Sequence, residues 1–223
     1  MNKQEEIMKQ FMVDADQPIV QSRIKNIGFW SALCSAIFYL AFDIAAILNM
    51  SGILTSPYWI SILYYTPSLF LALSFLVMTV GIHYYAAAES KIYSHIGIAI
   101  AGIYATMNCF IYIIQVLIIA PSMLNGQFTN VALFEMAPGK PLFAANALAY
   151  TLMGISTLFF AFVFRGNTLE KKIRKVLFVH GIISPTIVGV LIWPPFFYIS
   201  AVVGILYPLA AILIAVLFAR KQP

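Results

Sequence analysis

Residues 28–50 read GFWSALCSAIFYLAFDIAAILNM, a run of 23 residues in which Asp43 carries the only charge. A helix of about 20 apolar residues spans the hydrocarbon core of a bilayer. This run is therefore long enough and apolar enough to be a transmembrane helix. Because an ionisable group is costly inside a membrane and is retained there mainly for function, Asp43 becomes the first candidate for a functional residue.

The whole chain has the composition of an integral membrane protein. Of its 223 residues, 62% are hydrophobic and 9% are charged, and the mean hydropathy is +0.91. Soluble domains contain about 45–50% apolar and about 25% charged residues. This difference excludes a soluble enzyme, a disordered chain and a nucleic-acid-binding module, and it makes the lipid bilayer the first expected partner.

Five further apolar stretches follow the first one. We expect an all-α, polytopic membrane protein, a bundle of six transmembrane helices in a single domain that covers residues 1–223. Pro194 and Pro195 end the fifth helix, because proline cannot donate a helical hydrogen bond, and the last two helices then form a hairpin. The six predicted spans are residues 28–50, 58–82, 95–120, 142–164, 176–193 and 197–219.

The basic residues indicate which ends of the spans face the cytoplasm. Cytoplasmic loops are enriched in Lys and Arg. With the N-terminus inside, 12 of the 13 basic residues lie on the cytoplasmic side, and Lys140 alone lies outside. We therefore predict that both termini are cytoplasmic, that residues 1–27 form a cytoplasmic N-terminal segment and that residues 121–141 form the longest external loop. The charge bias and the small size suit the plasma membrane of a bacterium.

Two local signals lie outside the spans. Apolar residues at helical spacing in the N-terminal segment fit an amphipathic helix on the inner leaflet or a disordered tail, and Pro18 is expected to end any such helix. Asn167 followed by Glu170 has the spacing of a capping box and predicts a helix start before the fifth span. The apolar residues of the N-terminal segment are Ile7, Met8, Phe11 and Met12.

Polar residues recur on one face of several spans. Steps of three, four or seven residues place side chains on the same face of a helix. We expect these faces to form a polar and aromatic ligand pocket among the first four spans, in the outer half of the membrane. The alternative is that the same groups only bond to one another and hold the helices together, at about 0.6 kcal/mol per bond. The candidate residues are Tyr39, Asp43, Tyr104, Asn108, Gln115, Asn146 and Tyr150.

Three histidines offer a second kind of site. His83, His95 and His180 all lie near the predicted cytoplasmic boundary. Three imidazoles can hold a catalytic zinc ion, which would make the protein a membrane-embedded metal-dependent hydrolase. No two of them have the HExxH spacing, so we expect neither a metal nor a cofactor, and the histidine site remains an alternative.

The polar pocket favours a protein that binds or transports a small, partly apolar molecule. Asp43 would be the coupling or ligand-pairing group, and Thr66-Pro67 and Ser184-Pro185 would be bending points. Two alternatives stay open: a metal-dependent hydrolase, and a non-catalytic sensor or partner subunit. Whether the protein is an enzyme therefore stays open as well. The chain contains no strict GxxxG motif, so a homodimer stays open as well.

Overall fold

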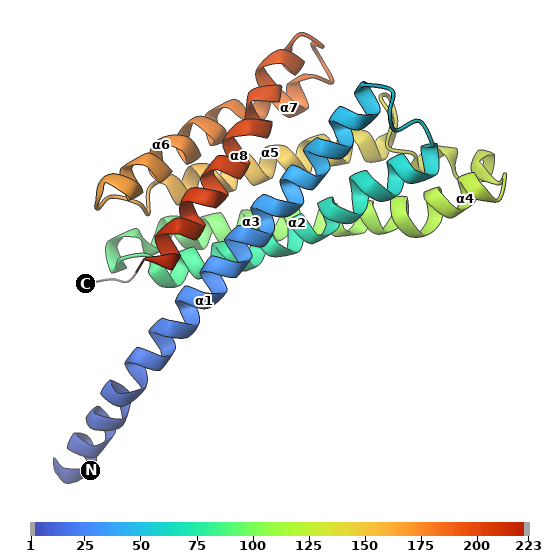
Figure 1. Cartoon of the computed structure of the whole chain (residues 1–223). Helices are drawn as coiled ribbons and strands as arrows, with labels where there is room; N and C mark the ends of the chain where they lie inside the picture. The colour runs from blue at the N-terminus through green and yellow to red at the C-terminus, as the bar shows by residue number, and fades with distance from the viewer. Residues whose placement is uncertain (1–2, 221–223) are drawn as a thin grey trace.

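The computed structural model describes the backbone of residues 3–220 and the side chains of residues 20–220. The protein is all-helical, with 84% helix and no strand among the described residues. Six of the helices are long, and in Figure 1 they run back and forth through one bundle. These helices are α1 (Lys3–Met50), α2 (Pro57–Tyr85), α3 (Lys91–Ile114), α5 (Pro141–Ala161), α6 (Thr168–Ile183) and α8 (Phe196–Ala219).

Five segments are long enough and apolar enough to cross a membrane. They overlap five of the six predicted spans, although Val20–Met50 and Ala88–Leu124 begin eight and seven residues earlier than predicted. Helix α6 together with the short helix α7 (Pro185–Gly189) covers the remaining span. The chain thus has five to six long apolar helices that could span a bilayer, as expected of a membrane protein. The five segments are Val20–Met50, Pro57–Tyr85, Ala88–Leu124, Pro141–Ala161 and Phe196–Ala219.

The sixth predicted span is broken in two by a proline. Helix α6 ends at Ile183, and α7 begins at Pro185. Pro185 has no N–H to donate to the carbonyl one turn earlier, so one helical hydrogen bond is missing at the break. In contrast, α2 continues through Pro67 and α8 continues through Pro208. In Figure 1, α6 and α7 together run from one end of the bundle to the other.

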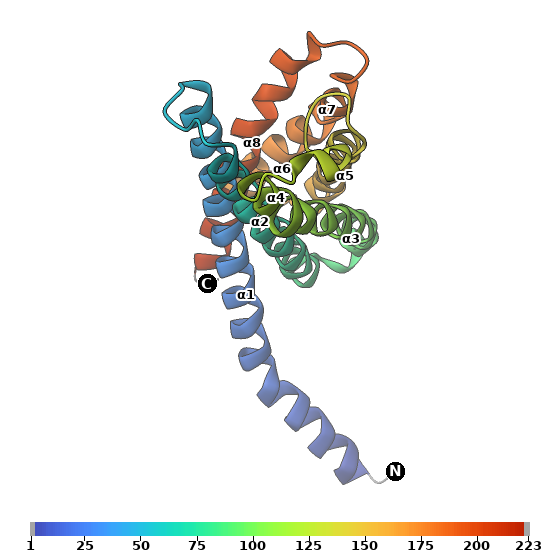
Figure 2. The same cartoon turned by 90° about the vertical axis from the view of Figure 1, so that its right-hand side faces the viewer.

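The six long helices form a closed ring in chain order. Each of α1, α2, α3, α5, α6 and α8 packs against the next, and α8 returns to α1. Figure 2, turned by 90°, shows α4 (Ala120–Leu124) in front of this ring. Antiparallel neighbours of this kind are what short connections produce.

The two ends of the bundle differ in charge. In Figure 1 the α2–α3 link, the α5–α6 link and the C-terminal end of α8 lie at one end, and the other links lie opposite. We call the first one the basic end. Lys91 begins α3, Arg165 lies in the α5–α6 link and Arg220 follows α8 at this end. Lys140 lies at the opposite end, immediately before α5.

Helix α1 is much longer than a membrane span. It extends over 48 residues from Lys3 to Met50, roughly 72 Å at about 1.5 Å per residue, and its N-terminal half leaves the bundle in Figure 1. The expectation that Pro18 ends a helix is wrong. A proline removes one helical hydrogen bond, and the helix continues on both sides of it. The predicted apolar face of residues 7–12 falls outside the described side chains.

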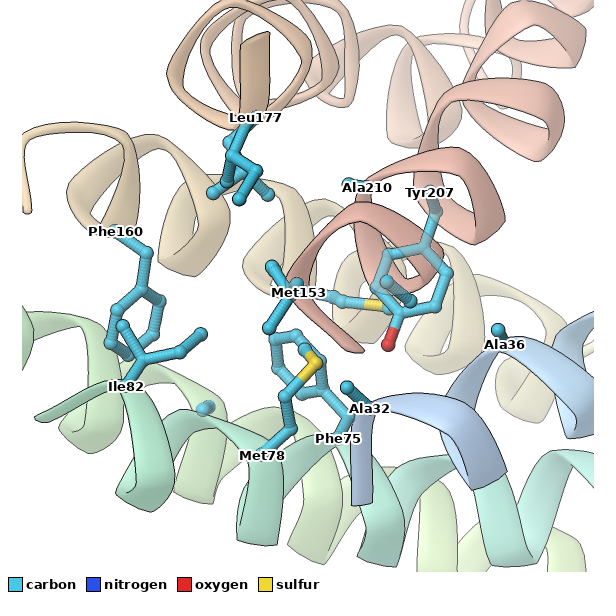
Figure 3. Packing of buried hydrophobic residues seen from close by; sticks show 14 of the residues in the cluster. Ala32, Ala36, Phe75, Met78, Ile82, Met153, Phe160, Leu177, Tyr207 and Ala210 are labelled. Carbon is cyan, nitrogen blue, oxygen red and sulfur yellow. The ribbon is translucent and has the colours of Figure 1, made fainter. Parts of the chain in front are cut away.

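Small residues let the helices approach closely in the core. Figure 3 shows the small side chain of Ala32 beside Phe75, and Ala36 belongs to the same buried cluster. A Cβ added to Gly154 would lie 1.9 Å from the side chain of Ser184. Close contact between α5 and α6 therefore depends on this glycine, as is common where membrane helices cross.

The outer surface of the bundle is apolar. Large side chains face outward all around it, including Ile37 at 53%, Phe110 at 64% and Ile205 at 72% exposure. Contiguous exposed apolar surface of this extent is unfavourable in water. It matches a helical surface in contact with lipid, where the helices satisfy their own backbone hydrogen bonds.

The predicted capping box begins α6 and also joins it to α2. Asn167 Oδ1 accepts hydrogen bonds from the backbone N–H groups of Leu169 at 2.9 Å and Glu170 at 3.2 Å. The Glu170 carboxylate accepts from Gly166 N at 2.8 Å and from Tyr85 Oη at 2.9 Å. This arrangement satisfies free N–H groups at the helix start and explains why α6 begins eight residues before the predicted span.

The longest link lies between α3 and α5, opposite the basic end. It contains a π-helical turn (Gln115–Ile119), α4 and two short 3₁₀ turns (Phe128–Asn130 and Ala132–Phe134). Gly126 and Gly139 have φ values of +68° and +82°, a backbone conformation that favours glycine. Both positions lie in turns, as their sequence context predicts.

Candidate functional site

Two predicted amides meet in a hydrogen-bonded network between α3 and α5. Asn146 Nδ2 donates to Asn108 Oδ1 at 3.1 Å and lies 2.8 Å from Tyr112 Oη, to which it also donates. Tyr112 Oη donates in turn to Tyr150 Oη at 3.0 Å. We call these four residues the amide–tyrosine network. Asn108 and Tyr112 are four residues apart on α3, and Asn146 and Tyr150 are four residues apart on α5, so each pair shares one face of its helix.

Two polar atoms in and next to this network make no hydrogen bond of normal geometry within the described part of the chain. They are Tyr104 Oη and Asn108 Nδ2. Both side chains are 0% exposed, and they lie one turn apart on α3. A buried polar group without a partner costs about 1–3 kcal/mol. Such groups are rare in native proteins and each calls for an explanation.

Tyr39 and Asp43 lie on the face of α1 that is turned toward α8. A Cβ added to Gly204 of α8 would lie 3.9 Å from Tyr39 Oη and 4.0 Å from Asp43 Oδ1. The missing side chain at Gly204 therefore leaves room beside both polar groups. Tyr39 is buried, whereas Asp43 is partly exposed.

An aromatic chain through the middle of the bundle connects these two regions. Ring centroids are 5.0 Å apart for Tyr39 and Tyr207, 5.9 Å for Tyr207 and Phe75, and 5.3 Å for Phe75 and Tyr104. Tyr104 lies 5.7 Å from Tyr150 of the amide–tyrosine network. These distances are typical of favourable aromatic pairs. Figure 3 shows Phe75 and Tyr207 facing the same part of the core.

The site therefore draws on α8 as well as on the first four predicted spans. Tyr207 of α8 is 1% exposed and also forms a hydrogen bond with Ser35 of α1. The sequence-based prediction does not include this residue, because its helix is very apolar and has no amide or acidic side chain. A usable signal was present, since Gly204 and Tyr207 lie three residues apart and share one face.

Gln115 has a different environment from the other predicted residues. Its Nε2 donates to the backbone carbonyl of Phe134 at 2.7 Å. Phe134 belongs to the link between α3 and α5, and Gln115 begins the π-helical turn. Gln115 thus attaches this link to the end of the bundle and makes no hydrogen bond to the amide–tyrosine network.

The three histidines do not gather at one point. His83 and His95 pack with ring centroids 4.3 Å apart, and His83 Nδ1 lies 2.8 Å from Ser94 Oγ. His180 Nδ1 lies 2.7 Å from Thr157 Oγ1, buried in the bundle. Within the described side chains, no group of three or more His, Cys, Asp or Glu residues is placed to hold a metal ion. The hydrolase alternative has no geometric support here.

The side chains of this region offer hydrogen-bonding groups and aromatic surface. Tyrosine hydroxyls and carboxamides donate and accept hydrogen bonds, and aromatic rings provide apolar walls. Comparison with known protein families, with curated proteins and with solved structures gives no match to this chain.

Proposed function

We propose that this membrane protein binds or transports a small, partly apolar molecule that carries a hydrogen-bond acceptor. The observation that supports this most directly is the pair of buried, unpartnered donors on α3, Tyr104 Oη and Asn108 Nδ2. An acceptor on a bound molecule would satisfy both, which would offset their cost of burial. The rings of Phe75 and Tyr150, each within 6 Å of Tyr104, would contact the apolar part.

Asp43 would serve as the coupling or ligand-pairing group. It is the one acidic residue within the first span, and ionisable residues inside membranes usually mark a ligand or an ion pathway. The aromatic chain from Tyr39 to Tyr150 would connect this carboxylate with the donors on α3. Gly204 would leave space for a ligand group beside Asp43.

We further propose six crossings of the cell membrane, with the basic end in the cytoplasm. The distribution of basic residues supports this orientation, because 12 of 13 lie on one side in such a topology. The proposed ligand site then lies between the two membrane surfaces, and the link held by Gln115 lies outside.

The binding proposal is tested by native mass spectrometry of the protein extracted from membranes in mild detergent. We expect a discrete small-molecule adduct on the wild-type chain. Asn108→Leu, which keeps the number and branching of the side-chain heavy atoms and removes the amide, should lower its occupancy about 5- to 100-fold, the range for one lost buried hydrogen bond. Asp43→Asn should also lower occupancy while the helical content by circular dichroism stays unchanged.

Asn49→Leu is the matched control for this experiment. Asn49 is also an amide in a membrane helix, and its Nδ2 donates to Tyr64 Oη at 3.2 Å, outside the amide–tyrosine network. Its substitution should leave the adduct in place. A wild-type chain with no adduct, or an adduct that survives both Asn108→Leu and Asp43→Asn, would contradict the proposal.

A further inference from the structure

A groove of about 560 Å³ opens between α1 and α8 at the basic end. Its polar side consists of Ser22, Lys25 and Asn26 from α1 and Arg220 at the end of α8. Its apolar side consists of Phe29, Trp30, Phe218 and Ala219. Trp30 is 61% exposed. None of the described residues that line the groove is acidic.

The wall of the groove is fixed by close packing. A Cβ added to Gly28 would lie 2.7 Å from the ring of Phe218, and one added to Gly81 would lie 3.1 Å from Gly28 Cα. Three helices, α1, α2 and α8, thus meet around one pair of glycines. Phe218 is 4% exposed, so it forms a firm boundary between the groove and the core.

An apolar stripe continues from the groove along α1 toward the middle of the bundle. Ile27, Trp30 and Ile37 are exposed by 51%, 61% and 53%. Their spacing of three and seven residues places them on one face of the helix. A long hydrocarbon chain can lie along this stripe, whereas a soluble phosphate compound would contact the polar side alone.

We propose that this groove binds one anionic phospholipid. The phosphate would lie between Lys25 and Arg220, and an acyl chain would follow Trp30 and Ile37 into the membrane. Basic pockets between transmembrane helices are suited to acidic headgroups, and indole rings prefer the headgroup level. This site is independent of the proposed ligand site, which lies in the core.

Fluorescence of Trp30 tests this proposal on the full-length chain. The protein carries Trp59→Phe and Trp193→Phe so that Trp30 is the only tryptophan. It is titrated in detergent micelles with dibrominated phosphatidylglycerol and, separately, with dibrominated phosphatidylcholine. We expect saturable quenching at a lower mole fraction of phosphatidylglycerol. Lys25→Gln combined with Arg220→Gln should raise the half-saturating fraction about 30-fold, as expected for two lost charges near a membrane surface.

Lys171→Gln combined with Lys175→Gln is the matched control. It removes the same charge from α6, where Lys171, Arg174, Lys175 and Phe178 line a separate hollow of about 250 Å³. This control should bind phosphatidylglycerol like the parent chain. Glycerol phosphate without acyl chains should not displace the lipid, and displacement would show that the site takes a soluble phosphate instead. Equal quenching by both lipids, or equal loss in both double variants, would overturn the proposal.

Discussion

At the scale of single residues, packing around Gly154 leaves no room for one more carbon atom. Gly154→Ala should destabilise the protein by about 1–3 kcal/mol, the usual cost of overpacking, because its Cβ would meet Ser184 at 1.9 Å. Thermal unfolding in detergent, followed by circular dichroism, measures this effect. Gly102→Ala is the control, since a Cβ there meets nothing within 4 Å and alanine favours a helix. A Gly154→Ala chain as stable as Gly102→Ala would contradict the described α5–α6 contact.

Polar residues that share a helix face can be recognised from the sequence where several of them recur at helical spacing. Asn108, Asn146 and Tyr150 could be grouped because polar side chains recur at helical spacing on both α3 and α5. The other polar residues of α8, Tyr198 and Ser200, lie near its start, and only the tertiary packing places Tyr207 beside Tyr39. The hydrogen bonds of Glu170 to two other segments likewise depend on how the α5–α6 link folds back on α2.

At the scale of elements, Gln115 attaches the α3–α5 link to the bundle through one hydrogen bond. Gln115→Leu removes the donor to the Phe134 carbonyl. We expect amide hydrogen exchange in residues 128–136 to become about fivefold faster, which corresponds to a net bond of about 1 kcal/mol. Gln127→Leu, at an exposed position in the same link, should leave exchange unchanged. Equal exchange in wild type and Gln115→Leu would show that the bond does not hold the link.

Hydropathy predicts the long elements well because lipid imposes a minimum length of apolar helix. The ends of α2, α5 and α8 therefore lie close to the predicted ones. Hydropathy does not predict α6, which starts in a charged stretch and depends on the Asn167 cap for its beginning. Hydropathy also does not predict whether α1 ends at Pro18. A proline removes one helical hydrogen bond, and a long helix can continue on both sides of it.

At the scale of the whole molecule, the ring of six helices brings α8 back against α1. This closure places Gly204 and Tyr207 beside Tyr39 and Asp43. Spacing within a helix indicates which residues share a face, but not which helix is opposite that face. The order of helices around the ring could therefore not be predicted from the sequence, and the participation of α8 in the site follows from that order.

The membrane topology is tested most directly by labelling single cysteines in intact cells with a membrane-impermeant maleimide. Cys34→Ala and Cys109→Ala remove the natural thiols, and a cysteine then replaces Thr168 at the basic end or Pro194 in the α7–α8 link, both exposed. With six crossings, Pro194→Cys is labelled in intact cells and Thr168→Cys only after permeabilisation. Labelling of both positions from the same side would contradict a crossing by α6 and α7 and, with it, the proposed topology.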